Sequence, residues 1–373
     1  MAKGKSTDKS GEGKKKPPRP VSAAGCQSRI ARLDRQLVKL AQERARLTVR
    51  AAHLDPAASP VAACDEEPFE RAMANVAGPL PKPKVRTVLS ELASGCRALV
   101  RTLRVAYLGP AYSYSHLAAL HRFGHSVEFM PVAAISAVFE EVNRGHSDFG
   151  LVPIENSTDG RIADTLEMFT RLPVRICGEV EMQIHHALLG KCPRNEVKEV
   201  YSRPQALSQC RNWLIKHLPT ARGIEVTSTS TAAQLARDKP GAAAIASYEA
   251  GVHYGLGVLA ERIEDNPGNT TRFAVISMQS APRTGSDKTA LLFEVEHRPG
   301  SLVEALNVFR RNRLNMTWIE SFPIPESRRK YLFFVELEGH ETDARIRRAL
   351  DQLARRTQRL EILGSFPVPP AAD

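Results

Sequence analysis

Five short polar segments carry most of the side chains that could act on a small molecule. Each is rich in serine, threonine, asparagine or glutamine, and they lie at residues 113–115, 155–157, 202–205, 228–231 and 269–272. Such residues commonly form turns and helix caps, and that alternative stays open from the residue types alone. Five such segments within one stretch of alternating strands and helices favour a crevice lined with hydrogen-bond donors, which would bind an anionic small molecule.

The common cofactor and metal signatures are absent from the sequence. It contains no glycine-rich dinucleotide or phosphate loop and no His-Glu-x-x-His motif. The six cysteines form no Cys-x-x-Cys pair, which argues against a zinc ribbon or a disulfide framework. His185 and His186 are neighbours, so in a strand their rings would point to opposite faces and could not share a metal ion. We therefore expect a site without metal or cofactor, and structural or surface roles for both histidines.

Composition and charge indicate a soluble protein of more than one domain. The 373 residues are 42% hydrophobic and 25% charged, which is average for globular chains. The formal charge is +11, but seven Lys or Arg and only two acidic residues lie within residues 1–20, a stretch that cannot form a core. Such a tail more often aids solubility than binds a partner, so no specific nucleic-acid binding is expected. No run of about 18 apolar residues and no signal-peptide pattern occurs, so we expect a cytoplasmic protein without membrane contact.

Helical periodicity predicts an N-terminal helical unit over residues 27–102, after a disordered basic tail over residues 1–26. Apolar residues recur at spacings of three, four and seven in two stretches, which end near Ala51 and Leu103 and are separated by prolines. A short third helix is expected within residues 66–77.

The spacing of apolar residues changes after this helical unit. Short apolar runs alternate with helical patterns over residues 103–280, which predicts an α/β domain whose strands are buried on both faces. In open α/β sheets the loops at the carboxyl ends of strands line the ligand crevice, and the polar segments fall in such loops. Residues 287–368 follow the order β-α-β-β-α-β, which predicts a ferredoxin-like α+β unit of the kind that pairs edge to edge.

Motifs in all three regions resemble known families. The α/β region resembles prephenate dehydratase in the order and spacing of its motifs, which are residues 108–116, 152–157, 201–207 and 263–273. Residues 299–302 and 315–323 are similar to the ACT domain appended to these enzymes, and residues 78–81 and 91–99 resemble the helical chorismate mutase end of the bifunctional enzyme. The resemblance implies a chorismate-mutase-like helical domain, a two-lobed dehydratase domain like a periplasmic binding protein, and a C-terminal ACT domain.

The resemblance also implies a reaction and a set of residues. The family removes water and carbon dioxide from prephenate to give phenylpyruvate, in L-phenylalanine biosynthesis, and aromatisation drives this without a cofactor. Thr271 matches the family's essential threonine, and we expect its hydroxyl to donate a hydrogen bond to the leaving oxygen. Arg272 would pair with a substrate carboxylate, or alternatively bridge to Glu155 or Asp265. The other expected substrate-binding residues are Ser113, Ser115, Glu155, Asn156, Ser157, Gln205, Thr229, Ser230 and Phe273.

Both ends of the chain depart from the family pattern. Arg44 and Glu67 match the mutase end, but no Lys or Arg lies between Arg50 and Arg71, where the family places two cations that would stabilise a dianionic transition state. We expect the helical unit to keep its fold for dimerisation, with mutase activity weak or lost. Phe322 stands where the ACT motif has arginine, which weakens the case for strong phenylalanine feedback. An L-phenylalanine effector site is still expected at an interface between two ACT domains, formed by Gly300, Ser301, Leu302, Asn315 and Glu320.

Two departures leave the substrate preference open. Tyr112 stands where the family usually has glycine, and Arg203 where it usually has histidine. The alternatives are arogenate dehydratase on the same scaffold and a non-catalytic amino-acid sensor; the retained Thr271 argues against the sensor. The assembly implied is a homodimer or homotetramer through the ACT and helical domains.

Overall fold

The computed structural model describes residues 22–55, 72–73, 76–158, 160–324 and 327–369. Residues 1–48 and 49–373 form two units, and each is described by itself. Among the described residues, no helix is long and apolar enough to cross a membrane.

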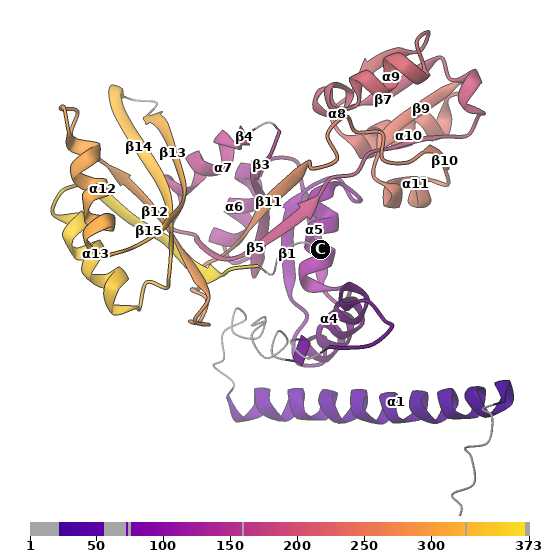
Figure 1. Cartoon of the computed structure of the whole chain (residues 1–373), viewed down its shortest axis with the longest axis horizontal. Coiled ribbons are helices and arrows are strands. Elements are labelled where there is room, and N and C mark those ends of the chain that lie inside the picture. Colours follow the sequence, from indigo (N-terminus) through magenta and orange to yellow (C-terminus); the bar gives the residue numbers. More distant parts are fainter. Residues whose placement is uncertain (1–21, 56–71, 74–75, 159, 325–326, 370–373) are drawn as a thin grey trace, which may run out of the picture. The chain divides into compact units, whose positions relative to one another are not determined.

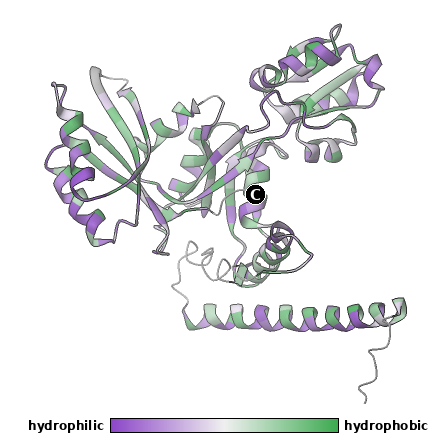
Figure 2. Ribbon diagram, viewed as in Figure 1, coloured by the Kyte–Doolittle hydropathy of each residue, from purple (hydrophilic) through white to green (hydrophobic). Residues whose placement is uncertain are grey.

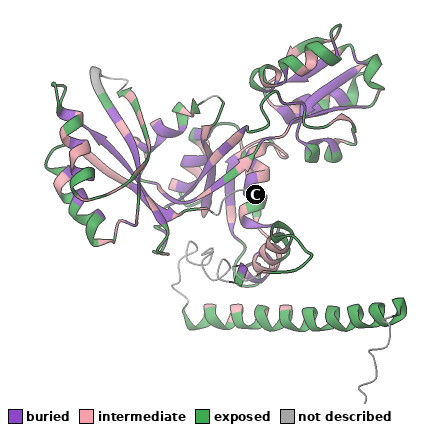
Figure 3. Cartoon of the chain, in the orientation of Figure 1, coloured by how far each residue is buried: buried purple, intermediate pink, exposed green. Residues whose placement is uncertain are grey.

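The first unit is dominated by helix α1 (Ala23–Leu54), which continues into the second unit. The Ser22 hydroxyl oxygen accepts a hydrogen bond from the Gly25 N–H at 3.1 Å and so caps its first turn. The helix therefore begins within the segment predicted to be a disordered tail. None of its residues is buried, and Figure 3 shows it exposed along nearly its whole length. Figure 2 shows hydrophobic and hydrophilic residues alternating along it, as its periodicity predicts.

Helix α4 (Lys82–Ala98) belongs to the second unit, and its first turn contains Pro83. Its buried Ser94 hydroxyl oxygen accepts a hydrogen bond from the N–H of Ser126, which follows helix α5 (Tyr114–Phe123), so α4 packs on the α/β region. Most of the predicted third helix lies outside the described residues.

A six-stranded sheet forms the first lobe of the α/β region (Figure 1). Strand β1 runs parallel to its neighbours β2 and β3, whereas β11 returns from later in the chain and runs antiparallel between β3 and β5. The strand order is β2-β1-β3-β11-β5, with β4 paired to β3. The elements of the first lobe are β1 (Arg104–Leu108), α5 (Tyr114–Phe123), β2 (Glu128–Val132), α6 (Ile135–Asn143), β3 (Phe149–Asn156), β4 (Gly160–Arg161), α7 (Ala163–Phe169), β5 (Arg175–Gln183) and β11 (Thr270–Ser277).

A five-stranded sheet in the order β10-β6-β9-β7-β8 forms the second lobe, which is inserted between β5 and β11. Its central strand β9 is a run of small apolar residues that is buried throughout. This matches the prediction of strands covered on both faces. The elements are β6 (Ala187–Gly190), η1 (Arg194–Glu196), β7 (Glu199–Ser202), α8 (Pro204–Gln209), α9 (Arg211–His217), β8 (Arg222–Glu225), α10 (Thr229–Asp238), β9 (Ala242–Ala246), α11 (Tyr248–Tyr254) and β10 (Gly257–Ala260).

The C-terminal domain is the predicted β-α-β-β-α-β unit. Its antiparallel sheet has the order β13-β14-β12-β15. Its elements are β12 (Asp287–Glu294), α12 (Ser301–Arg311), β13 (Met316–Ile324), β14 (Ser327–Glu338), α13 (Ala344–Ala354) and β15 (Arg359–Pro367). The predicted order is confirmed because the turns and the helical period both mark it in the sequence.

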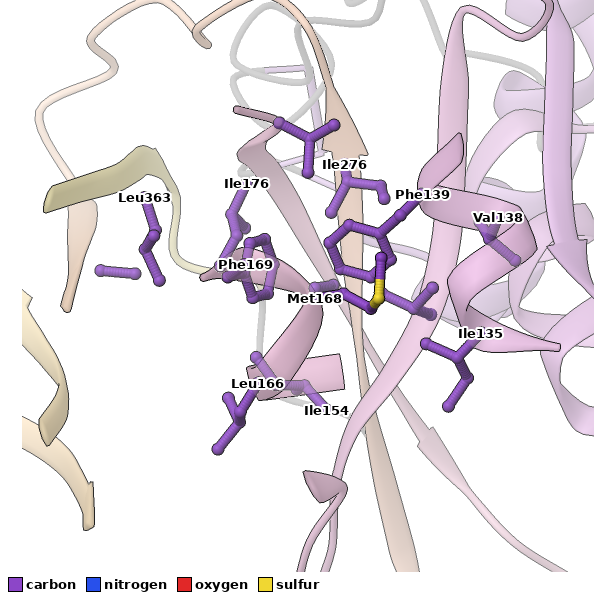
Figure 4. Close-up of a cluster of buried hydrophobic side chains, with 14 of the residues drawn as sticks. Ile135, Val138, Phe139, Ile154, Leu166, Met168, Phe169, Ile176, Ile276 and Leu363 are labelled. Carbon is purple, nitrogen blue, oxygen red and sulfur yellow. The ribbon is translucent and has the colours of Figure 1, made fainter. Parts of the chain in front are cut away.

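One hydrophobic core joins the first lobe to the C-terminal domain. Figure 4 shows Leu363 of β15 beside Ile176 of β5, in the same cluster as Phe139 and Phe169. The backbone of β15 at Gly364 lies close to the backbone of β5 at Ile176. A Cβ at Gly364, whose φ is +144°, would overlap the carbonyl oxygen of Ile176. The two domains therefore share buried side chains rather than meeting through a thin polar surface.

Candidate functional site

Three neighbouring residues at the start of β11 have three different surroundings. Side chains alternate along a strand, so Thr271 and Phe273 lie on one face and Arg272 on the other. Phe273 is 1% exposed and packs with Tyr107 and Phe123 in the core of the first lobe. The substrate-binding role expected for Phe273 does not fit this position. Thr271 alone keeps surroundings that suit the expected chemistry.

The Thr271 hydroxyl is held by the side-chain amide of Asn156, its cross-strand neighbour on β3. The Asn156 Oδ1 accepts a hydrogen bond from the backbone N–H of Thr158 at 2.9 Å. This fixes the orientation of the amide, so its Nδ2 donates to Thr271 Oγ1 at 2.8 Å and to Asn269 Oδ1 at 3.0 Å. Within the part of the chain that the structure describes, the Thr271 hydroxyl accepts this bond and donates none. Its own hydrogen is thus available to a bound molecule.

The amide network continues into the second lobe. With Asn269 Oδ1 used as an acceptor, Asn269 Nδ2 donates to Gln209 Oε1 at 3.1 Å. The same Gln209 oxygen lies 2.9 Å from His186 Nε2, so this nitrogen carries the proton. The other ring nitrogen lies 3.2 Å from the hydroxyl oxygen of Tyr114, whose single hydrogen is donated to the backbone carbonyl of His185 at 2.7 Å. The network therefore runs from Thr271 to His186 and joins the two lobes.

Burial controls the ionisation of this network. His186 is 2% exposed, and burial lowers its pKa and keeps the imidazole neutral. Burial also raises the pKa of the Tyr114 hydroxyl well above its usual value, so it remains a donor. Burial pushes the pKa of Glu264 upward, but hydrogen bonds from the His185 ring and the His186 N–H outweigh it and hold this pKa below its usual value. The far end of the network is thus neutral at His186 and Tyr114, and the Glu264 carboxylate beside it is paired.

The expected substrate residues beside Thr271 help to hold the strand. The Ser157 hydroxyl accepts a hydrogen bond from the Thr270 N–H at 2.9 Å, and the Ser157 N–H donates to the Thr270 carbonyl. Glu155 and Asn156 lie opposite Arg272 and Thr271 across the ladder. Residues 155–157 and 269–272 are therefore brought together, as expected of two segments of one site.

The remaining predicted residues lie at the starts of helices. Ser113 caps α5, since its hydroxyl oxygen accepts from the His116 N–H, and Ser115 is buried in the first turn. Thr229 and Ser230 form the first turn of α10, which Ser228 caps. The Ser230 hydroxyl is fully buried and has no hydrogen-bond partner among the described residues. These side chains take no part in the amide network.

Gln209, which the sequence did not point to, lies in the amide network, whereas the predicted Gln205 does not. Gln205 is exposed on α8, and the network contains Gln209 from the last position of that helix. Sequence reasoning also missed His186 and Tyr114, whose partners lie far away along the chain. Asn269 was within a polar segment already singled out. Its signal was an amide immediately before the strand that carries Thr271.

The chain is similar to known proteins in sequence. Residues 105–281 match the prephenate dehydratase family and residues 289–355 match the ACT domain. A bifunctional chorismate mutase/prephenate dehydratase of Stutzerimonas stutzeri is 40% identical over 351 residues, which are 91% of this chain and 96% of that protein. This chain belongs to the bifunctional chorismate mutase/prephenate dehydratase family.

Solved structures support the same fold. A prephenate dehydratase of Arthrobacter aurescens in complex with L-Phe is 32% identical, with a TM-score of 0.67, and the match covers 72% of this chain and 92% of that one. GqqA, described as a quorum-quenching acylase, is 28% identical with a TM-score of 0.66, over 72% of this chain and 98% of that one. The predicted fold class, with an N-terminal helical part, a two-lobed α/β domain and an ACT domain, is confirmed.

The Arg272 guanidinium lies among three carboxylates of the protein. Its guanidinium contacts Glu155 at 2.8 Å, Glu179 at 2.6 Å and Glu336 of the ACT domain at 2.9 Å. The expected pairing with a substrate carboxylate is therefore corrected, because each of the three guanidinium nitrogens already donates a hydrogen bond to a carboxylate of the protein. The alternative of a bridge to Glu155 is the one observed. Asp265 instead accepts hydrogen bonds from the backbone N–H groups of Asn212 and Trp213.

The ACT domain contains a pocket of about 370 Å³ at the start of α12. Ser301 and Leu302 line it with His297, Tyr331 and Phe333, and the preceding Gly300 has the left-handed backbone that starts the helix. The buried Ser301 hydroxyl has no hydrogen-bond partner among the described residues.

Two residues expected at the effector site lie outside this pocket. Asn315 donates to Glu338 Oε1 at 2.8 Å, and Glu320 pairs with Arg161 of the first lobe at 3.0 Å. Within this chain, the structure brings only part of the predicted effector set together.

Of the two residues predicted to match the chorismate mutase end, the structure describes only one. Arg44 lies on α1, whereas Glu67 lies outside the described residues. No group of three or more His, Cys, Asp or Glu side chains that could hold a metal ion occurs among the residues the structure describes.

Proposed function

We propose that this chain is a prephenate dehydratase in which Thr271 assists the departure of the hydroxyl group. In the reaction the ring C–O bond and the bond to the ring carboxylate both break. The electron pair of the broken C–C bond stays with the ring and completes its aromatic system as carbon dioxide leaves, and the departing hydroxide takes up a proton from solvent and leaves as water. Charge develops on the leaving oxygen, so a donor aimed at that atom stabilises the transition state more than the ground state.

The orientation of the Asn156 amide is the observation that carries this proposal. Because Asn156 donates to Thr271 Oγ1, the threonine hydrogen can point only toward another acceptor. Donation into the threonine oxygen also polarises the hydroxyl and strengthens it as a donor. A threonine that donated to a protein carbonyl would lack this capacity.

The first turn of α10 is proposed to hold a substrate carboxylate. A helix N-terminus presents unsatisfied N–H groups and a partial positive charge. Ser230 adds a buried hydroxyl that has no described partner, and Thr229 lies beside it. Together with Thr271 this gives two separate anchoring points for a dianionic ring.

Three further assignments stay proposals. The bifunctional relatives favour prephenate over arogenate as the substrate. L-Phenylalanine is the proposed effector, because a relative was solved with L-Phe and this chain has the ACT pocket lined by Ser301. Mutase activity is proposed to be weak or lost, since the stretch between Arg50 and Arg71 has no cation. A cytoplasmic location and a homo-oligomeric state remain predictions.

The test is turnover of prephenate, arogenate and chorismate by the purified full chain. We expect phenylpyruvate from prephenate, with a measurable rate for Thr271→Ser and a loss of at least about a hundredfold for Thr271→Val, which keeps the shape without the hydroxyl. Little or no prephenate should form from chorismate. Equal rates for the serine and valine variants would remove Thr271 from the mechanism, and no product from any substrate would reject the enzyme assignment.

A further inference from the structure

A buried ionic cluster links the ACT domain to the strand that carries Thr271. It consists of two cations and three carboxylates: Arg272, Lys288, Glu155, Glu179 and Glu336. We call it the Arg272 cluster. Lys288 and Glu336 come from β12 and β14 of the ACT domain, and the other three come from the first lobe.

The contact between Arg272 and Glu336 has the geometry of a strong ion pair. The Arg272 Nη2 lies 2.9 Å from both carboxylate oxygens of Glu336, which is 1% exposed. Trp318 of β13 covers the guanidinium, with its ring centre 5.1 Å from the Arg272 Cζ. Burial raises the pKa of Glu336, although the neighbouring cations oppose this. Removal of either partner would leave a buried charge without compensation.

The backbone ladder beside Arg272 is interrupted. Thr271 pairs with Asn156 and Arg272 with Glu155, but Phe273 pairs with Pro153, so Ile154 is an extra residue on β3. Such a bulge bends the strand and weakens the local pairing. On its other side β11 pairs with β5 without interruption from Thr270 to Val275, so the bulge weakens only the pairing of Thr271 with β3, the strand that carries Asn156. The side chain of Arg272, one residue away, adds contacts to Glu155 on β3, Glu179 on β5 and Glu336 on β14.

We infer that Glu336 is a positioning residue for the dehydratase reaction, which acts through Arg272 to hold the Thr271 hydroxyl in place. The ACT domain thus supplies part of the support of the active site as well as a ligand pocket. This inference rests on the proposed function of Thr271. Loss of the contact would let the start of β11 shift at the bulge, and the hydrogen bond between Asn156 and Thr271 would lengthen.

Matched substitutions in the full chain separate this role from general domain docking. Glu336→Gln removes the charge and keeps the shape. Glu338→Gln makes the same change two residues along β14, where the side chain is exposed and contacts Asn315. Glu341→Gln breaks another ion pair between the domains, at 2.7 Å with Arg175, which pairs with Ser277 at the far end of β11.

The expected result is a fall in kcat of about tenfold for Glu336→Gln with little change in KM, and changes below about twofold for both control variants. Because Glu336 acts through Thr271, the effects of Glu336→Gln and Thr271→Ser on kcat should be less than additive. Equal losses for Glu336→Gln and Glu341→Gln would overturn the inference, as would strict additivity with Thr271→Ser.

A second variant keeps the test decisive if Glu336→Gln does not fold, as judged by its thermal midpoint. Arg272→Lys keeps the positive charge, but a lysine ammonium lacks the planar, forked donors with which the guanidinium contacts three carboxylates at once. It should lower kcat at least as far as Glu336→Gln is expected to, and unchanged kcat would again overturn the inference. An inactive wild-type protein would instead reject the proposed function, so the two failures are distinguishable.

Discussion

Replacement of Asn156 by aspartate should reverse the direction of the hydrogen bond to Thr271. Aspartate has the same shape but no N–H groups. The Thr271 hydroxyl would then donate its hydrogen to the new carboxylate, at the position where Nδ2 now lies 2.8 Å away. The hydrogen expected to reach the leaving oxygen would be occupied, while the fold would stay the same.

The magnitude follows from the bonds that change. Asn156→Asp removes a donor to Thr271 and sets a carboxylate oxygen against Asn269 Oδ1, now 3.0 Å from Nδ2. A net hydrogen bond is worth about 1 kcal/mol, and a hydrogen bond to a developing charge about 1.5–3 kcal/mol. Loss of both amounts to about 2.5–4 kcal/mol of transition-state stabilisation, which corresponds to a fall in kcat of roughly 70- to 900-fold.

The assay is steady-state formation of phenylpyruvate from prephenate, with the thermal midpoint measured beside it. Asn266→Asp is the matched control. It adds the same charge in the loop before β11, where Asn266 Oδ1 already acts as an acceptor for the Gly268 N–H. A kcat for Asn156→Asp within about threefold of the wild type, or an equal loss in Asn266→Asp, would refute the argument from amide orientation.

Three further predictions concern the network and the domain contact. Gln209→Leu should lower kcat by about tenfold or more because Asn269 loses its acceptor, whereas Gln205→Leu should leave the rate within about twofold because the Gln205 side chain is exposed. Gly364→Ala should lower the free energy of unfolding by about 1–3 kcal/mol or more, measured by urea denaturation, because its Cβ would overlap the Ile176 backbone; Gly285→Ala, at a φ of +95° with open space around it, measures the backbone term alone. Burial lowers the pKa of His186, so between pH 6.5 and its folded value the unfolded chain binds a proton that the folded chain does not, and the free energy of unfolding should fall as the pH drops through this window. His186→Asn should reduce that slope and the exposed His53→Asn should not; equal slopes in all three proteins would contradict the buried neutral imidazole.

Strand and helix periodicity predicted the order of elements well. The ACT domain is the clearest case, because each turn is marked by glycine, proline or polar residues and each helix by a regular apolar face. The N-terminal helix was placed correctly but begins at Ala23, since Ser22 caps it within the segment assigned to the tail.

The site was harder to predict because contacts between distant residues define it. Thr271 and Asn156 came from motifs, yet the direction of Arg272 required the knowledge that a further sheet covers that face of β11. Strand alternation alone would have separated Arg272 from Thr271, and this signal was available. No sequence signal pointed to the role of His186 in the network, because its partners Tyr114 and Gln209 come from elements that only the folded chain brings together.

The core shared by the first lobe and the ACT domain has a consequence for how such proteins can be recombined. The segments that match the two families are separate in the sequence, at residues 105–281 and 289–355, with a short connection between them. Yet Ile176 and Leu363 are buried against each other, and Gly364 lies against the backbone of β5. A chimera joined in the connection would inherit two half-cores that evolved with different partners. Exchange of regulatory domains among relatives would therefore succeed only if the outer faces of β5 and β11 were exchanged with them.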